Sequence, residues 1–198
     1  MLPSPPALLA LAASLTIATL PSEPQWRSAG TRNGVELSFR DDALLEAREV
    51  RASAELPYAA DRILAVVCDF TQVLDPDVRE ARMLSGDLAS GYEVYLRYAS
   101  RFAVVAARDV VIDVRRHANG CTWSEVAGRV DPQRGVVRMP LLRGSWTVAP
   151  LASSRSRVTY QIAVRPGGNI PGWMVRRGAM SALADVMARV SRKLIESR

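Results

Sequence analysis

The residue types best suited to catalysis or metal binding are sparse in this chain, which has one histidine and two cysteines among 198 residues. His117 lies beside Asn119 and Gly120, a turn-forming pair, so its side chain is expected to be exposed. Cys68 and Cys121 match no metal-binding spacing. The chain also lacks a glycine-rich phosphate loop, a G-x-S-x-G elbow and an H-E-x-x-H helix. The sequence therefore predicts no catalytic residue, no metal site and no cofactor, and we expect a protein that is not an enzyme.

The two cysteines are too few for a disulfide framework. Cys68 falls on a predicted helix and Cys121 on a distant predicted strand, so the sequence gives no reason to expect a bond between them. We expect both to be small core residues.

Arg138 is the polar residue with the most distinctive surroundings, because it stands in the apolar run Val136 to Met139. Strand alternation could turn its side chain inward, toward the hydroxyl or carboxylate of a ligand. Pairing with a carboxylate of the protein, or exposure to solvent, is equally consistent with the pattern.

Apolar side chains that could contact a ligand lie on three strand-like segments and on one helix. Apolar residues alternate along 92–100, 109–116 and 157–165, and they recur at steps of three and four along 171–196. Such stripes form either a solid core or the wall of a cavity. The face of the helix opposite its stripe carries Arg177, Ser181, Asp185, Arg189 and Arg192. The predicted ligand contacts are Val94, Leu96, Tyr98, Ile112, Arg138, Tyr160, Ile162, Met180, Leu183 and Met187.

The elements that must position these side chains are two helices and a long run of strands. A helix is predicted over Pro57 to Asp69 and a longer one over Pro171 to Glu196, each with one apolar face. Short polar turns separate the strands, which predicts an antiparallel meander of about seven to nine strands, covered by the C-terminal helix. The strands are expected near Val35 to Arg40, Leu44 to Ala54, Ala81 to Asp87, Tyr92 to Ser100, Asp109 to Arg116, Thr122 to Val130, Val136 to Val148 and Arg157 to Arg165.

The N-terminal residues differ in composition from the rest of the chain. Residues 7–20 are apolar and uncharged but shorter than the roughly 20 residues that span a bilayer as a helix. We therefore expect residues 1–20 to be a signal peptide or an N-terminal anchor, residues 21–33 a linker and residues 34–198 one domain. This organisation predicts a periplasmic or secreted protein, and a cytoplasmic one if the segment is not a signal.

The net charge of +6 comes almost entirely from arginines spread over every segment. Nucleic-acid binding would instead concentrate basic residues on one helix or groove, so no nucleic-acid partner is expected. A basic surface is compatible with transient contact with anionic membranes.

Three motifs in this order of elements resemble the START (StAR-related lipid transfer) domains, in their bacterial form, within the helix-grip superfamily. The run from Arg165 to Val175, RPGGNIPGWMV, is similar to the segment that introduces the last helix of bacterial START proteins. Arg108-Asp109 matches the pair that opens a central strand in that family. Val137-Arg138 together with Gly144-Ser145-Trp146 and Pro150 resembles the strand pair that follows.

The resemblance implies an α+β helix-grip fold, in which a curved antiparallel β-sheet wraps around a long C-terminal α-helix. It also implies an internal cavity that binds, and with it transfers, a lipid or other apolar small molecule, in a monomer without a cofactor. The alternative within the same superfamily is a polyketide cyclase or aromatase, in which Tyr95, Arg97, Tyr98, Arg138 and Tyr160 would position a reactive chain. An export signal argues against that alternative, because such enzymes act on carrier-bound intermediates in the cytoplasm.

Overall fold

The computed structural model describes residues 25–72, 74–99 and 106–196, and in the C-terminal helix it leaves out the side chains of 173–181 and 184. The predicted signal segment, residues 1–20, lies outside this description. Within the described residues the strands are β1 (Arg27–Arg32), β2 (Val35–Asp42), β3 (Ala47–Leu56), β4 (Val78–Asp87), β5 (Gly91–Tyr98), β6 (Ala107–His117), β7 (Gly120–Glu125), β8 (Val136–Arg138), β9 (Leu141–Ala152) and β10 (Arg155–Arg165). The helices are α1 (Ala60–Val67) and α2 (Gly172–Glu196).

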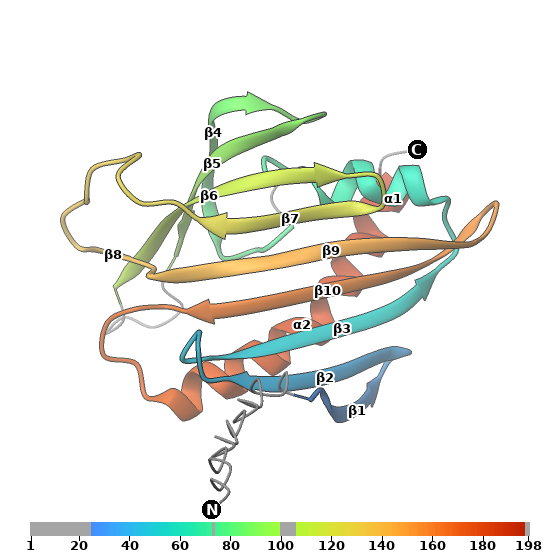
Figure 1. Ribbon diagram of the computed structural model, residues 1–198, viewed down its shortest axis with the longest axis horizontal. Coiled ribbons are helices and arrows are strands. Elements are labelled where there is room, and N and C mark those ends of the chain that lie inside the picture. The colour runs from blue at the N-terminus through green and yellow to red at the C-terminus, as the bar shows by residue number, and fades with distance from the viewer. Residues whose placement is uncertain (1–24, 73, 100–105, 197–198) are drawn as a thin grey trace, which may run out of the picture.

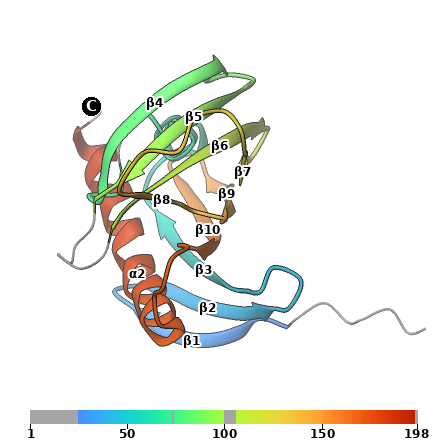
Figure 2. The ribbon, with the colours of Figure 1, turned by 90° about the vertical axis from the view of Figure 1, so that its left-hand side faces the viewer.

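The strands form one sheet in the order β1-β2-β3-β10-β9-β7-β6-β5-β4, and neighbours along this path are antiparallel. Figure 1 shows β2, β3, β10, β9 and β7 side by side across the molecule, with β4 and β5 rising from them and α2 behind the sheet. The sheet curves around α2, which lies along its open side in Figure 2. The predicted α+β helix-grip architecture is confirmed.

α2 covers the sheet because one side of it is apolar. Leu183, Val186, Met187, Val190 and Leu194 are buried and belong to the same core cluster as the inward side chains of the strands. The C-terminal end of α2 also meets α1, where the Arg62 guanidinium donates a hydrogen bond of 2.5 Å to the Leu194 carbonyl oxygen. The two helices therefore enclose the concave face of the sheet together.

The sheet begins earlier in the chain than the sequence patterns indicate. Residues 27–32, which fall in the expected linker, form β1 and pair with β2 through a tight turn at Asn33 and Gly34. Both turn residues have positive φ, 51° and 76°, which is the conformation that a two-residue hairpin of this kind requires and that Asn-Gly adopts readily.

The strand expected over Val136 to Val148 is divided in two. Pro140 follows the three-residue β8 and has no N–H to donate, so the ladder is interrupted there. β8 pairs in parallel with β6, and the Met139 N–H donates to the Asp109 carbonyl oxygen at 2.9 Å. β9 then starts at Leu141 and pairs with β7 and β10.

The two cysteines are buried, as expected of core residues, but they also form a disulfide, a bond that no sequence pattern indicated. Cys68, which caps the C-terminal end of α1, forms a disulfide with Cys121 on β7, and their Cα atoms are 5.9 Å apart. The sequence could not reveal this proximity, because it depends on α1 crossing to the distant β7 strand. The bond fixes the end of α1 to the sheet.

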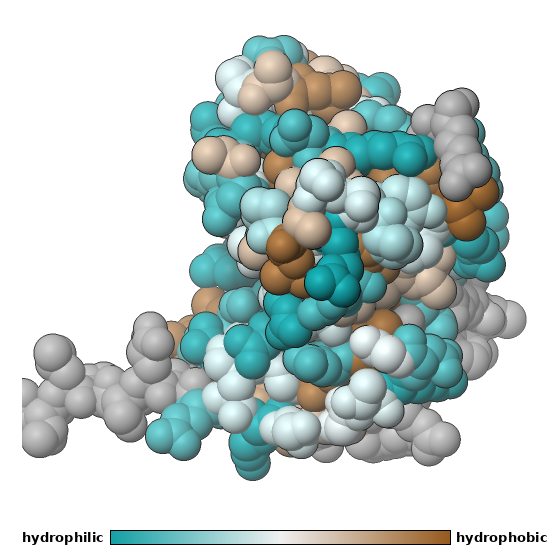
Figure 3. All heavy atoms as spheres, turned by 90° about the vertical axis from the view of Figure 1, so that its right-hand side faces the viewer, coloured by the Kyte–Doolittle hydropathy of each residue, from teal (hydrophilic) through white to brown (hydrophobic). Residues whose placement is uncertain are grey.

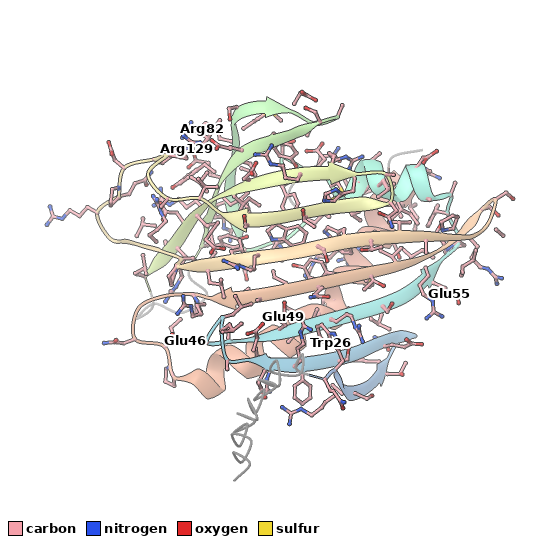
Figure 4. The ribbon with its side chains drawn as sticks, viewed as in Figure 1. Trp26, Glu46, Glu49, Glu55, Arg82 and Arg129 are labelled. Carbon is pink, nitrogen blue, oxygen red and sulfur yellow. A yellow bond between two sulfur atoms is a disulfide. The ribbon has the colours of Figure 1, made fainter. Side chains whose placement is uncertain are left out.

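The surface is predominantly polar at the end of the molecule that Figure 3 shows, where hydrophobic residues are scattered among hydrophilic ones. The outer face of β2 and β3 is also polar. Arg40 and Arg51 stack on the Trp26 ring at 4.9 and 4.2 Å from its centroid, beside β2 and β3 in Figure 4. The apolar surface is thus directed mainly toward the space between the sheet and the helices.

Candidate ligand-binding cavity

A cavity of about 310 Å³ lies between α2, the segment 69–78 after α1, and the concave face of β5, β9 and β10. This volume is at the lower end of the range of roughly 300–1,000 Å³ that is usual for small-molecule sites. Most of its lining is apolar, as a lipid site requires. The apolar lining residues are Val67, Phe70, Leu74, Val78, Leu96, Ala99, Met139, Leu142, Trp146, Ile162, Val164, Ala182, Leu183 and Val186.

An aromatic cluster supports the floor of the cavity. Tyr160 on β10 pairs across the strands with Trp146 on β9, and their ring centroids are 4.3 Å apart. Trp123 on β7 stacks with the Tyr160 ring at 5.9 Å and meets Phe70 edge to face at 4.9 Å. Such contacts fix the orientation of each ring, so the Tyr160 hydroxyl is held in place.

Gly144 makes room for this cluster. A Cβ at this position would lie 2.2 Å from the Gln161 carbonyl oxygen and 2.5 Å from Cζ2 of Trp123. Trp123 therefore lies flat over β9 only because residue 144 has no side chain.

The segment that forms one wall of the cavity is held at its beginning. The Tyr92 hydroxyl donates to the Cys68 carbonyl oxygen at 2.9 Å and accepts from the Phe70 N–H at 2.7 Å. The Asp69 carboxylate accepts hydrogen bonds from the Thr71 N–H, at 3.0 Å, and from the Gln72 side chain, at 2.9 Å. The disulfide and these bonds together position the beginning of this segment, from Cys68 to Gln72.

Four polar residues of the lining act electrostatically on one another: Tyr98, Tyr160, Asp75 and Arg189. Burial is the main cause that raises the pKa of the Tyr98 and Tyr160 hydroxyls, and the Asp75 carboxylate is the second cause for both. Arg189 acts on the pKa of Tyr160 in the opposite direction. The two hydroxyls therefore stay protonated at neutral pH, under the influence of Asp75 and, for Tyr160, also of Arg189.

Five of the ten predicted ligand contacts line this cavity: Leu96, Tyr98, Tyr160, Ile162 and Leu183. Val94, Ile112 and Met187 are buried in the core but are not part of the lining. The side chain of Met180 lies outside the described residues.

Arg138, the remaining predicted contact, does not line the cavity. Its Nε and one terminal nitrogen bind the two oxygens of the Asp109 carboxylate, at 2.7 and 3.1 Å, and the same terminal nitrogen donates to the Val130 carbonyl oxygen. Asp109 is buried, and this bonding raises the pKa of Arg138. Of the alternatives open for Arg138, the structure shows pairing with a protein carboxylate.

This ion pair belongs to the convex side of the sheet. The Tyr95 hydroxyl donates to Asp109 at 3.3 Å, and Tyr95 alternates with the cavity residue Leu96 along β5. Arg82 lies over the Tyr95 ring at 5.6 Å, and Arg129 pairs with Glu93 at 2.8 Å. Arg82 and Arg129 are both found near the β4–β5 end of the sheet in Figure 4.

Sequence patterns missed Arg189 and Asp75. Arg189 was assigned to the outer face of the helix, but it lines the cavity at the edge of the buried stripe, three residues after Val186. That spacing was the available signal, because residues i and i+3 are neighbours on a helix surface. For Asp75, in the Asp75-Pro76-Asp77 loop, the sequence held no signal that it would face a cavity.

The single histidine and the acidic residues do not form a recognisable metal-binding cluster in the described part of the chain. His117 is exposed, and its Nε2 lies 3.0 Å from the Thr122 hydroxyl. In the described parts of the chain, no three His, Cys, Asp or Glu residues gather in a way that could hold a metal ion. Among the same residues, no helix has the length and apolar character needed to cross a bilayer.

Comparison with known proteins gives a short sequence match and extensive structural ones. No protein-family model matches the chain. An uncharacterized protein of Pseudomonas aeruginosa is 34% identical over 85 residues, an alignment that spans 39% of this chain and 41% of that relative.

The solved structures match over most of the chain. A STAR-related lipid transfer protein of Xanthomonas axonopodis superposes with a TM-score of 0.73 at 24% identity, over 85% of this chain and 98% of that one. Human StAR-related lipid transfer protein 5 gives a TM-score of 0.76 at 15% identity, over 86% of each chain. The Zhui aromatase/cyclase of a Streptomyces species gives 0.54 at 15% identity, over 77% of this chain and 96% of that one. The chain therefore has the START-domain form of the helix-grip fold.

Proposed function

We propose that this protein binds a lipid or other apolar small molecule in the cavity beneath α2 and does not convert it chemically. The observation that carries the proposal is the cavity itself, about 310 Å³ in volume and lined mostly by apolar side chains. Apolar surface is stabilised by roughly 25 cal/mol for each Å² removed from water, so an apolar ligand gains free energy by entering. The names of the START proteins with the same fold support this proposal.

The cyclase alternative has weaker support from the positions of its candidate residues. Of the five side chains that would position a reactive chain, Tyr98 and Tyr160 line the cavity, whereas Tyr95, Arg97 and Arg138 are not part of its lining. Arg138 is already bound by Asp109. A carrier role needs only the apolar enclosure and a few hydrogen-bonding groups, which is what the cavity offers.

We further propose that the protein acts outside the cytoplasm. The support is the disulfide between Cys68 and Cys121, since such bonds form and persist chiefly in oxidising compartments. The apolar residues 7–20 agree with export. Fractionation of cells followed by N-terminal sequencing tests this: a periplasmic or secreted product is expected, and a reduced cytoplasmic protein that retains Met1 would contradict it.

The binding proposal is tested with 1,6-diphenyl-1,3,5-hexatriene, an uncharged fluorophore that emits strongly only in apolar surroundings. Ile162→Trp should fill the cavity, because Ile162 lines it, whereas Ile195→Trp makes the same change at a side chain that is 55% exposed. We expect saturable binding to the native protein and to Ile195→Trp, and binding at least about tenfold weaker to Ile162→Trp.

Circular dichroism and thermal melting must show that both variants fold before their fluorescence is compared. A folded Ile162→Trp variant that binds the fluorophore as tightly as the native protein would contradict the assignment of this cavity. So would a native protein that binds none.

A further inference from the structure

We propose that the polar part of the cavity, formed by Asp75, Arg189, Tyr98 and Tyr160, selects a lipid whose head is an uncharged hydroxyl group. Lipids of the same chain length that carry a carboxylate or an ammonium group are excluded. The inference rests on the proposed function, because it specifies the ligand of the same cavity.

Arg189 supplies a hydrogen-bond donor that lacks an acceptor. Its side chain lines the cavity from α2, and its Nε is buried without a hydrogen-bond partner. No carboxylate of the described residues lies within 4.0 Å of its guanidinium. The Nε is occluded by protein atoms, so a ligand oxygen would instead meet the terminal N–H groups of the guanidinium, for which no partner is found among the described residues.

Asp75, on the cavity wall formed by the segment after α1, supplies a hydrogen-bond acceptor whose charge is opposite to that of Arg189. One of its oxygens accepts the Asp77 N–H at 2.9 Å, and no arginine or lysine of the described residues lies within 4.0 Å of the carboxylate. The second oxygen is thus available to a donor in the cavity.

Tyr98 and Tyr160 add two hydroxyl groups to the polar part of the cavity. Among the described residues neither hydroxyl has a hydrogen-bond partner, and both line the cavity. Because burial keeps them protonated, each can donate one hydrogen bond and accept others. All four residues line the same cavity of about 310 Å³, and the electrostatic action of Asp75 on both hydroxyls and of Arg189 on that of Tyr160 agrees with one head group meeting them together.

The other charged residues of the lining are engaged elsewhere. Asp69 is bound by Thr71 and Gln72, and Asp77 has a further interaction of its own. Arg108 donates to the carbonyl oxygens of Ala106 and Pro166. Asp75 and Arg189 are therefore the charged groups that remain for a ligand.

A head group that satisfies both residues must accept a hydrogen bond from Arg189 and donate one to Asp75. A carboxylate only accepts, and it would face the negative charge of Asp75. An ammonium group only donates, and it would face the positive charge of Arg189. Either ion would also lose its hydration on entering the cavity, and the neighbouring group of like charge would add to that cost. A hydroxyl has one donor and two acceptor positions and no charge, so it fits both residues.

The volume of the cavity limits the size of the apolar chain or ring that carries this head group. A volume of about 310 Å³ suits one acyl or alkyl chain or one compact ring system, and it leaves little space for a lipid with two long chains. The inferred ligand is thus a single-chain or ring-shaped lipid alcohol.

The test compares oleyl alcohol, oleate and oleylamine, which share one chain and differ in the head, as competitors of diphenylhexatriene at pH 7.4. We expect the alcohol to displace the fluorophore at concentrations at least about tenfold lower than either ion, a difference that corresponds to 1.4 kcal/mol or more. Displacement by oleate or oleylamine at equal or lower concentration would overturn the inference.

Charge-removing variants provide the second arm of the test. Asp75→Asn should improve displacement by oleate about tenfold relative to the alcohol, and Arg189→Gln should do the same for oleylamine. Asp185→Asn and Arg192→Gln make the same changes at exposed positions of α2, and they should leave the order unchanged. If neither cavity variant changes the displacing concentration of its ion relative to that of the alcohol, these residues do not select the head group.

The failure of this inference is distinguishable from the failure of the proposed function. Diphenylhexatriene has no polar head, so its binding depends only on the apolar cavity. A protein that does not bind it overturns both proposals. A protein that binds it but does not prefer the alcohol overturns the head-group inference alone.

Discussion

Cys68, at the C-terminal end of α1, is bonded to Cys121, the second residue of β7, across a sequence separation of 53 residues. The residue after Cys68 begins the segment that forms one wall of the cavity, and Tyr92 binds the backbone on both sides of Asp69. The disulfide therefore anchors the cavity wall as well as the helix.

Reduction of this disulfide should destabilise the domain substantially. The chain-entropy model gives about 4 kcal/mol for a loop of this length, with measured values commonly about 2–5 kcal/mol. Urea unfolding of the native protein, with and without a reductant, measures the difference. A Cys68→Ala/Cys121→Ala variant should unfold at the lower urea concentration and should not respond to reductant. Equal stability in the oxidised and reduced proteins would contradict the bond.

Gly144→Ala should be strongly destabilising. The added methyl group would collide with the Gln161 carbonyl oxygen and with the Trp123 ring, neither of which can move without disturbing the aromatic cluster. We expect a loss of about 3 kcal/mol or more, at the upper end for overpacked sites. Gly135→Ala is the matched change, since a Cβ there meets nothing within 4 Å and only the positive φ of 76° opposes it, at about 1–2 kcal/mol. Chemical denaturation of both variants tests this order.

Tyr92 should make the protein sensitive to alkaline pH. Burial raises the pKa of Tyr92 to about 12 from its usual value of 10.0. Between these values the unfolded chain releases the proton while the folded chain retains it, so stability falls as pH rises above 10.

Tyr92→Phe removes this contribution, and the decline of unfolding free energy with pH should become shallower by about 1.4 kcal/mol per pH unit between pH 10 and 12. Some decline remains, because the pKa values of Tyr98 and Tyr160 are also raised. Near pH 7 the variant loses its bonds to the Cys68 carbonyl oxygen and the Phe70 N–H, at a cost of about 1–2 kcal/mol. Denaturant titrations at several pH values measure both effects, and parallel pH profiles for the two proteins would refute the assignment.

Arg138→Met should lower stability without weakening ligand binding. The change leaves the buried Asp109 carboxylate without its partner, which costs about 3–5 kcal/mol at such sites. An Asp109→Leu/Arg138→Met variant should recover part of this loss, because no uncompensated charge remains. Thermal melting gives the stabilities, and diphenylhexatriene titration gives the affinity. A folded Arg138→Met protein with a large loss of affinity would show that Arg138 does contribute to ligand binding.

The fold could be predicted because its main determinants are local and periodic. The strands alternate and the stripe of α2 repeats every three or four residues, and these patterns persist over whole elements. Pro140 breaks the ladder between β8 and β9, and the sequence also contained that signal. The contact between Cys68 and Cys121 depends on how distant elements cross, and no local pattern records it.

The cavity could be predicted only in part, because alternation gives the face of a strand and not the position along it. Val94 and Leu96 lie on the same face of β5, next to their β6 partners Ile112 and Val110. Leu96 lines the cavity, whereas Val94 is packed in the core. The packing of all the elements together determines where along a strand the cavity ends and the solid core begins.

The central claim, that the cavity beneath α2 holds an apolar ligand, is tested most directly by mass spectrometry. The purified native protein and its folded Ile162→Trp variant are incubated with a total bacterial lipid extract, separated from free lipid by gel filtration, and extracted with organic solvent. We predict close to one lipid per chain from the native protein and a loss of most of it from the variant. Equal amounts of lipid from the two proteins, or none from the native one, would contradict the claim.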